Sequence, residues 1–179
     1  MPSVIGHLLA GYAAGRTLSS NSSGKFISIV LFCSVLPDFD VLSFQFGIPY
    51  ESIWGHRGFS HSLFFGLIAG AFFSFLFYTK KEWTRYALIF SFIIILHALL
   101  DGLTNGGLGC GYLIPFDSTR YFFPRQVIQV SPFGLQLFFS ERGVKVLQSE
   151  LLWIGIPSLT LLLIGRLMRY FNAQRRTAA

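Results

Sequence analysis

Residues 86–101 read YALIFSFIIILHALLD, an apolar run that closes on His97 and Asp101. In a helix, two residues four positions apart project from the same face. The run lies near the lower limit of about 17 residues for crossing a bilayer. An imidazole and a carboxylate at the end of an apolar helix are costly to place unless they have a function. The stretch therefore predicts a membrane helix that ends in a polar site.

Apolar runs of this kind recur along the chain. Of its 179 residues 53% are hydrophobic and 12% are charged, and its mean hydropathy is +0.58, values typical of membrane proteins. We predict an all-α, multi-helix, membrane-embedded bundle of about four or five apolar helices, forming a single domain over residues 1–179. The expected helices cover residues 3–18, 26–37, 62–78, 86–101 and 151–168.

The lengths of these runs and the segments between them refine this expectation. Residues 62–78 and 151–167 just reach the length of a span, whereas 26–37 are too short alone. The polar and aromatic stretch 38–60 is expected to form a loop with short helical pieces. Residues 102–148 contain several glycines and prolines, which predicts an irregular, cap-like segment rather than a span.

The basic residues are distributed as in a multi-pass membrane protein. The net charge is +6, but the Lys and Arg residues gather in the hinge 79–85 and in the C-terminal tail. This pattern is typical of the cytoplasmic ends of membrane segments, so we expect no nucleic-acid partner. Alternation of the helices then places the end of the 86–101 helix on the outer, periplasmic or extracellular side. The chain is therefore expected to cross a membrane several times.

The potential metal ligands gather in four clusters at the edges of the apolar runs. They comprise all four histidines and three of the four aspartates. By alternation of the helices, every cluster falls on the outer side. The clusters are His7; Asp38 and Asp40; His56 and His61; and His97 with Asp101.

A mixed set of imidazoles and carboxylates suits zinc, with manganese or iron as alternatives. Seven ligands are too many for one catalytic zinc ion, which uses three protein ligands. We therefore expect one or two divalent ions, of which two with a bridging carboxylate fit the count better. Such pairs serve phosphate-ester hydrolysis. Arg57 is the best candidate for holding an anionic group, because a guanidinium matches phosphate oxygens. Ser60 and Thr104 are candidates to orient the ligands.

Each cluster also has a purely structural interpretation. His7 alone could be a hydrogen-bonded packing residue, and Asp38 could cap a helix. Arg57 could form an ion pair with Asp38 or Asp40, and Asp101 could be a boundary residue before Gly102. At the level of the whole protein, the alternatives are a metal-ion transporter, a metal-binding membrane sensor, or an inert packing protein with His–Asp pairs.

The order of the motifs adds a resemblance to these observations. His7, PDFD (37–40), HRGFSHS (56–62) and HALLDGLTNGG (97–107) together resemble the YdjM-like family of bacterial inner-membrane metal-dependent hydrolases. The resemblance spans residues 1 to about 116. That family is distantly similar to zinc-dependent phospholipase C and to P1-type nucleases.

The resemblance implies metal-ligand roles for all seven clustered residues, with Asp40 as the further one beside the six others. Those soluble enzymes use an N-terminal Trp amine, whereas this chain begins Met1-Pro2. They also carry a second His-x-x-x-acid helix, and only one such pair occurs here, so a third ion is not expected. The ligand set is His7, Asp38, Asp40, His56, His61, His97 and Asp101.

Together these observations predict a membrane-bound, metal-dependent hydrolase that uses an ion-activated water to cleave a phosphoester. We expect catalytic roles for Asp40 and Arg57. A site at the membrane surface favours a phospholipid or a lipid-linked substrate that enters from the bilayer. The oligomeric state is not predicted.

Overall fold

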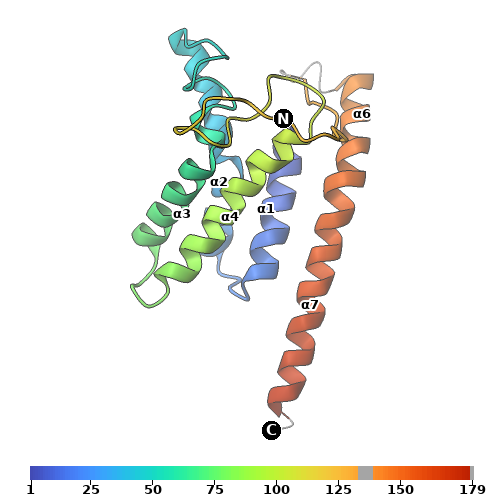
Figure 1. Cartoon of the computed structure of the whole chain (residues 1–179). Coiled ribbons are helices and arrows are strands. Elements are labelled where there is room, and N and C mark those ends of the chain that lie inside the picture. The colour runs from blue at the N-terminus through green and yellow to red at the C-terminus, as the bar shows by residue number, and fades with distance from the viewer. Residues whose placement is uncertain (133–138, 178–179) are drawn as a thin grey trace.

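The computed structural model describes residues 1–132 and 139–177 of the chain. Within these residues the fold is all-helical, as predicted, with isolated bridges in place of β-strands. Four α-helices form a bundle, and a long C-terminal helix lies beside it (Figure 1). The helices of the bundle are α1 (Val4–Leu18), α2 (Gly24–Val35), α3 (Leu63–Phe77) and α4 (Trp83–Gly102).

Serine residues define where three of these helices begin. Ser3, Ser23 and Ser62 precede α1, α2 and α3, and each hydroxyl accepts a hydrogen bond from a backbone N–H in the first turn. This arrangement satisfies a donor that the helix itself cannot. The helices then pack through apolar side chains such as Phe26 and Val30 of α2 against Phe90 and Ile93 of α4.

The second apolar run is longer than predicted. The α-helix ends at Val35, before Pro37, but the chain continues as the 3₁₀ helix η1 (Leu36–Phe46). Proline is tolerated there because the first turn of a helix needs no intrahelical N–H donor. Together α2 and η1 make an apolar helical segment of 23 residues, Gly24–Phe46. Residues 26–37 are too short alone, as expected, but the helical piece at the start of the predicted loop extends them to the length of a span.

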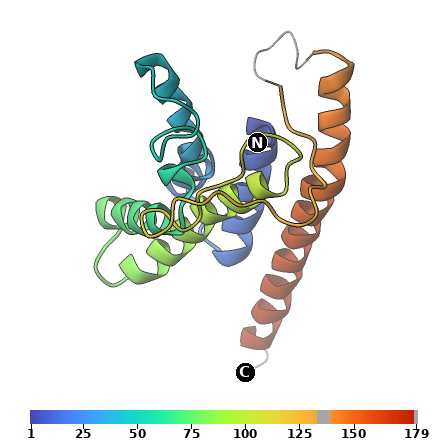
Figure 2. The same ribbon diagram turned by 45° about the horizontal axis from the view of Figure 1, so that its top comes forward.

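The last helix begins earlier than the predicted residue 151. It comprises α6 (Glu141–Glu150), a π-helical turn η3 (Leu151–Gly155) and α7 (Ile156–Thr177), which run on as one long rod (Figure 2). The first part buries Gly143 and Val146 and exposes Arg142 and Lys145. This amphipathic pattern has too few apolar residues to be recognised as part of a span. The predicted irregular segment 102–148 is therefore helical from residue 141.

Three helical segments have the length and composition to cross a membrane. They are Gly24–Phe46, Trp83–Gly102 and Glu141–Arg175, of 23, 20 and 35 residues. The apolar helix α3 has 15 residues, fewer than the about 20 that a full span needs. The prediction of about four or five apolar helices is confirmed, and within the described residues three helical segments are candidate spans, with α1 and α3 as shorter helices beside them.

The helices alternate in direction, so their ends fall into two groups (Figure 1). The turn after α1, the hinge between α3 and α4 and the end of α7 lie at one end. The N-terminus, η1 and the cap segment (residues 103–132) lie at the other. The cap segment is tied to the end of α4, where the backbone nitrogens of Phe123 and Ile128 donate to the carbonyls of Gly102 and Leu103.

Candidate metal centre

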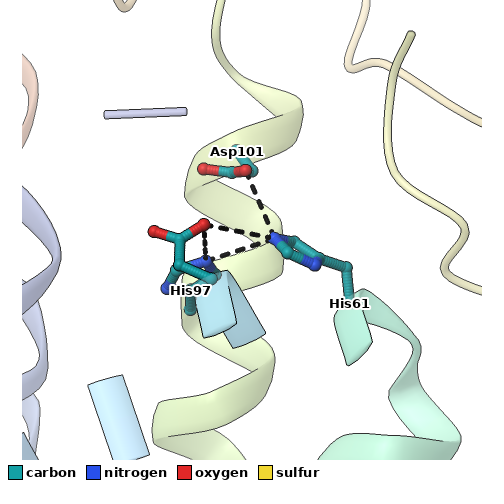
Figure 3. Close-up of side chains that lie close together, drawn as sticks. His61, His97 and Asp101 are labelled. Atoms are coloured by element: carbon teal, nitrogen blue, oxygen red, sulfur yellow. Dashed lines mark hydrogen bonds and ion pairs between the residues drawn. The ribbon is translucent and has the colours of Figure 1, made fainter. Parts of the chain in front are cut away.

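Four buried side chains meet at the capped end of the bundle. Asp38 comes from η1, His61 from the short 3₁₀ helix η2 (Phe59–His61), and His97 and Asp101 from α4. Each offers one ligand atom, and these atoms all lie within 4.8 Å of one another. Figure 3 shows His61 facing His97 and Asp101, which lie one turn apart on α4. The i, i+4 spacing of this pair thus places both side chains on the face that meets η2.

The contacts within this group are short. The Nε2 atom of His61 lies 3.2 Å from Nε2 of His97, 3.4 Å from Oδ2 of Asp101 and 3.8 Å from Oδ1 of Asp38. The Nε2 atom of His97 lies 3.4 Å from the same Asp38 oxygen. Two imidazole nitrogens and two carboxylates therefore point at one small volume.

The opposite nitrogens of both imidazoles have their own partners. His97 Nδ1 lies 2.8 Å from the carbonyl oxygen of Ser34, an acceptor, so this nitrogen carries the hydrogen. His61 Nδ1 lies 3.1 Å from Oδ2 of Asp40 and 3.0 Å from Oγ of Ser60. Partners of this kind fix the orientation and tautomer of ligating histidines. Both Nε2 atoms are thereby turned toward the group.

His7 of α1 lies against the same group. Its ring stacks on that of His97 with 3.7 Å between centroids, and its Nε2 lies 3.2 Å from Oδ1 of Asp101. Helix α1 thus contributes a fifth side chain to the group of four.

Several atoms in this cluster lack a hydrogen-bond partner. Among the described residues, seven buried side-chain polar atoms are in this condition, and five of them belong here: both nitrogens of His7, both carboxylate oxygens of Asp38 and Oδ1 of Asp101. The other two are hydroxyls of Ser43 and Tyr78. Because buried polar groups are nearly always paired, such a concentration indicates a missing partner. The three aspartate oxygens among them are acceptors, and a neutral imidazole keeps one acceptor nitrogen, so the group could hold a cation.

Asp40 and His56 lie outside this inner group. Together with His61 they form a second potential site, but the carboxylate of Asp40 is already surrounded by protein groups. Its Oδ1 lies 2.6 Å from His56 Nδ1. Its Oδ2 accepts from the Arg57 backbone nitrogen at 2.9 Å and from the Ser60 hydroxyl at 2.5 Å. In this arrangement Asp40 holds the loop 56–61 and orients His61.

Arg57 is buried beside Asp101, and its predicted role of holding a substrate anion remains a prediction. Its side chain is 1% exposed, and each guanidinium nitrogen donates to the protein. Nε donates to Asp101 at 2.9 Å, Nη1 to the Gly106 carbonyl at 2.7 Å and Nη2 to the Thr104 hydroxyl at 2.9 Å. The sequence offered Asp38 or Asp40 as ion-pair partners, whereas the partner is Asp101. These three bonds use three of the five N–H donors of the guanidinium and fix its position against Asp101.

The whole chain is similar to known membrane proteins. A family model described as YdjM inner membrane protein matches residues 1–173. The chain belongs to this family. A relative, the inner membrane protein YbcI of Escherichia coli (strain K12), is 38% identical over 170 residues, which cover 90% of this chain and 95% of the relative. No solved structure matches the chain. The YdjM family match includes all of the cap segment and most of the long C-terminal helix, whereas the motif resemblance ended at about residue 116.

Charges in this YdjM-family cluster stabilise one another. Burial lowers the pKa of His61, but its hydrogen bonds with Asp101 and Asp40 outweigh that effect and raise the pKa to about 9. Burial likewise lowers the pKa of Arg57, whereas the negative charge of Asp101 raises it, and the net shift is upward. Without an ion, His61 and Arg57 supply the positive charges that balance the buried aspartates.

Sequence reasoning missed the backbone contributions to the site. The carbonyl of Ser34 orients His97, and the carbonyl of Gly106 holds Arg57. Every residue has such a carbonyl, so no side-chain pattern could have indicated these two. Thr104, predicted as an orienting residue beside the ligands, contacts Arg57 instead of a histidine.

Proposed function

We propose that this YdjM-family membrane protein is a metal-dependent hydrolase that cleaves a phosphoester. The observation that carries the proposal is a group of buried histidine and aspartate side chains whose ligand atoms lie within 4.8 Å of one another at one end of the bundle. Five polar atoms of this group and of His7 make no hydrogen bond. The proposed ligands are His7, Asp38, His61, His97 and Asp101. Nitrogen and oxygen ligands of this kind suit zinc first and also manganese or iron.

The geometry favours a single ion in the inner group. A second ion at Asp40, His56 and His61 would have to share His61 and displace the hydrogen bonds that Asp40 accepts from Arg57 and Ser60. The inner group needs no such displacement. The roles of Asp40 as a catalytic residue and of Asp40 and His56 as ligands remain predictions from the sequence.

The ion and the residues around it would have different roles. When bound, a divalent ion supplies a Lewis acid that activates water at neutral pH and polarises a phosphoryl oxygen. Arg57 fixes the Asp101 carboxylate, and Asp40 fixes the ring of His61. Rigid support of this kind holds ligands in the geometry that a reaction requires.

The proposed ligands are most exposed on the side of η1, whose surface is apolar, and this supports a lipid substrate. Side chains of His7, His61, His97 and Asp101 have no exposed area, whereas that of Asp38 is 10% exposed. Asp38 lies on η1, which also exposes Phe39 and Phe46, the latter at 81%. A substrate that approaches from this side meets an apolar surface first. We therefore favour a phospholipid or a lipid-linked phosphoester.

The distribution of charge supports an outward-facing centre. The basic residues of the α1–α2 turn, of the α3–α4 hinge and of the end of α7 all belong to the end opposite the ligands (Figure 1). By the positive-inside rule that end faces the cytoplasm. The centre would then open at the periplasmic surface of the membrane.

The test is metal content together with hydrolysis. The protein is purified in detergent, and bound metal is measured by mass spectrometry for wild type, His97→Ala and Asp101→Asn. Asp117→Asn serves as a control, because Asp117 is an exposed-surface carboxylate at the same end. We expect about one ion per wild-type and control chain, loss in both centre variants, and cleavage of a generic phosphodiester or a short-chain phospholipid by wild type and control.

Two outcomes would contradict the proposal. A metal-free wild type after growth and purification with zinc would remove its basis, as would full metal retention in both centre variants. Bound metal without cleavage of any phosphoester would favour the alternative, a metal-binding membrane sensor or a metal-ion transporter. Ion flux into proteoliposomes would then identify a transporter.

A further inference from the structure

A second polar feature lies at the same end of the molecule, between the cap segment and α6. It is a pocket of about 300 Å³, a volume at the lower end of the range for small-molecule sites. Two of its walls come from segments far apart in the sequence. The lining residues are Asn105, Gln129, Val130, Arg142, Lys145 and Val146.

The lining is cationic and contains no carboxylate. Arg142 and Lys145 are three residues apart on α6, so they share a face of the helix. Both are exposed, and within the part of the chain that the structure describes neither has a hydrogen-bond or ion-pair partner. In this respect they differ from Arg57 and Arg120, whose guanidinium groups donate to protein oxygens. Their charges are therefore available to a ligand.

Amide groups form the opposite wall. The Asn105 side-chain nitrogen donates to Oε1 of Gln129 at 2.8 Å, and its oxygen accepts from the Val130 backbone nitrogen at 2.9 Å. The Gln129 backbone nitrogen donates to the Ser149 hydroxyl at 3.0 Å, which fixes this wall to α6. Because Oε1 of Gln129 is the acceptor, its Nε2 keeps two hydrogens to donate. Guanidinium, ammonium and amide donors thus surround one pocket.

We infer that this pocket binds a phosphate group. Several donors on different sides match a tetrahedral anion with several acceptor oxygens, and a guanidinium can bind two of them at once. Basic pockets near a membrane surface are typical sites for anionic headgroups. The pocket adjoins the metal centre through one short chain of contacts: Asn105 follows Thr104, which accepts from Arg57, which donates to Asp101. The inference does not depend on hydrolysis at that centre.

Binding to the full-length protein in maltoside detergent tests the inference. The probes are inorganic phosphate and dihexanoyl phosphatidylglycerol below its micelle concentration, each titrated by calorimetry. In Arg142→Gln/Lys145→Gln we expect binding to weaken about five-fold or more, because two charges are removed and each exposed charge pair changes an equilibrium by up to about a factor of five. Equal affinity for both probes would identify the phosphate alone as the ligand, and tighter binding of the lipid would identify a headgroup site.

A matched double variant separates a site from general attraction. Lys80→Gln/Lys81→Gln removes the same charge from the opposite end of the molecule and should leave the affinity unchanged. An equal loss in the two double variants would overturn the inference, because the binding would then reflect net charge. Absence of binding by either probe to the wild-type protein would overturn it as well.

Discussion

Asp40 illustrates how one carboxylate can hold together the loop beside the candidate metal centre. Its oxygens contact His56, the Arg57 backbone, Ser60 and His61. No single one of these contacts is unusual, but together they fix the loop that carries His61. The position of His61 therefore depends on Asp40 as well as on the residues that His61 faces.

Asp40→Asn should weaken metal binding without abolishing it. The amide keeps the volume of the side chain but has only one oxygen for four donors, so the ring of His61 loses part of its support. Loss of such an outer partner typically lowers metal affinity by about 10- to 100-fold. Competition with a chromophoric chelator measures the affinity, and Asp117→Asn is the control. Unchanged affinity in Asp40→Asn would contradict the supporting role.

Cys110 should be inert toward alkylation in the folded protein. It is completely buried, and burial raises the pKa of its thiol to about 12. The reactive species is the thiolate, which forms only as the pH approaches that value. At pH 8 we expect no modification of the protein in detergent, and complete modification after denaturation, when the pKa returns to its usual range. Mass spectrometry of iodoacetamide-treated samples gives the count, and rapid alkylation of Cys110 at pH 8 would contradict the described burial.

Residue types were more predictable than residue roles. His61, His97 and Asp101 could be selected because few other polar groups occur at the ends of the apolar runs. The role of Arg57 could not, because it depends on backbone conformation. Arg57 has φ +62°, in the left-handed region that side chains other than glycine rarely adopt. With the backbone in that conformation, the guanidinium is bonded to Asp101, Thr104 and Gly106 and is buried away from solvent.

At the scale of the elements, the close contact of α3 and α4 depends on a glycine. A Cβ atom on Gly70 would lie 2.3 Å from the backbone nitrogen of Ser91. The two helices can approach this closely only without a side chain at that position, as small residues permit in membrane bundles.

Gly70→Ala should therefore destabilise the bundle. The clash is with backbone, which cannot rotate away, so the helices must separate, at a cost of about 1–3 kcal/mol. Gly24→Ala is the matched control, because a Cβ there would have no atom within 4 Å and alanine favours a helix. Thermal unfolding in detergent, followed by circular dichroism, compares the two. A melting temperature of Gly70→Ala equal to that of wild type would contradict the packing.

The sequence predicted α1, α3 and α4 to within a few residues, because each coincides with an apolar run bounded by polar residues. It did not predict η1 or α6, for two different reasons. A 3₁₀ helix lacks the 3.6-residue period on which helix prediction rests, and Pro37 indicated an end where the helix only changes type. The polar face of α6 resembled a loop because its buried residues, such as Gly143 and Val146, are few.

At the scale of the whole molecule, the two ends of the bundle differ in chemistry. The ligands, the cap segment and the pocket lie at one end, and the basic turns lie at the other (Figure 1). If the basic end faces the cytoplasm, the two ends should differ in their reactivity toward a reagent that cannot cross the membrane.

Single cysteines test this orientation in intact cells. Asp117→Cys places a thiol on the partly exposed surface of the cap segment, and Lys81→Cys places one in the exposed α3–α4 hinge. The native cysteines are both buried and should not interfere. We expect an impermeant maleimide to label Asp117→Cys in spheroplasts, and Lys81→Cys only after lysis. The reverse pattern would show the centre to face the cytoplasm.

The centre takes its side chains from four segments between residues 7 and 101, and this separation has a consequence during synthesis. While the ribosome is still making α4, the nascent chain holds His7, Asp38, Arg57 and His61 but has neither His97 nor Asp101. Arg57 can therefore bond to Asp101 only after the end of α4 has been made and inserted. The proposed ligand set is complete only afterwards, so that metal loading of the proposed centre would report that insertion of the bundle is complete.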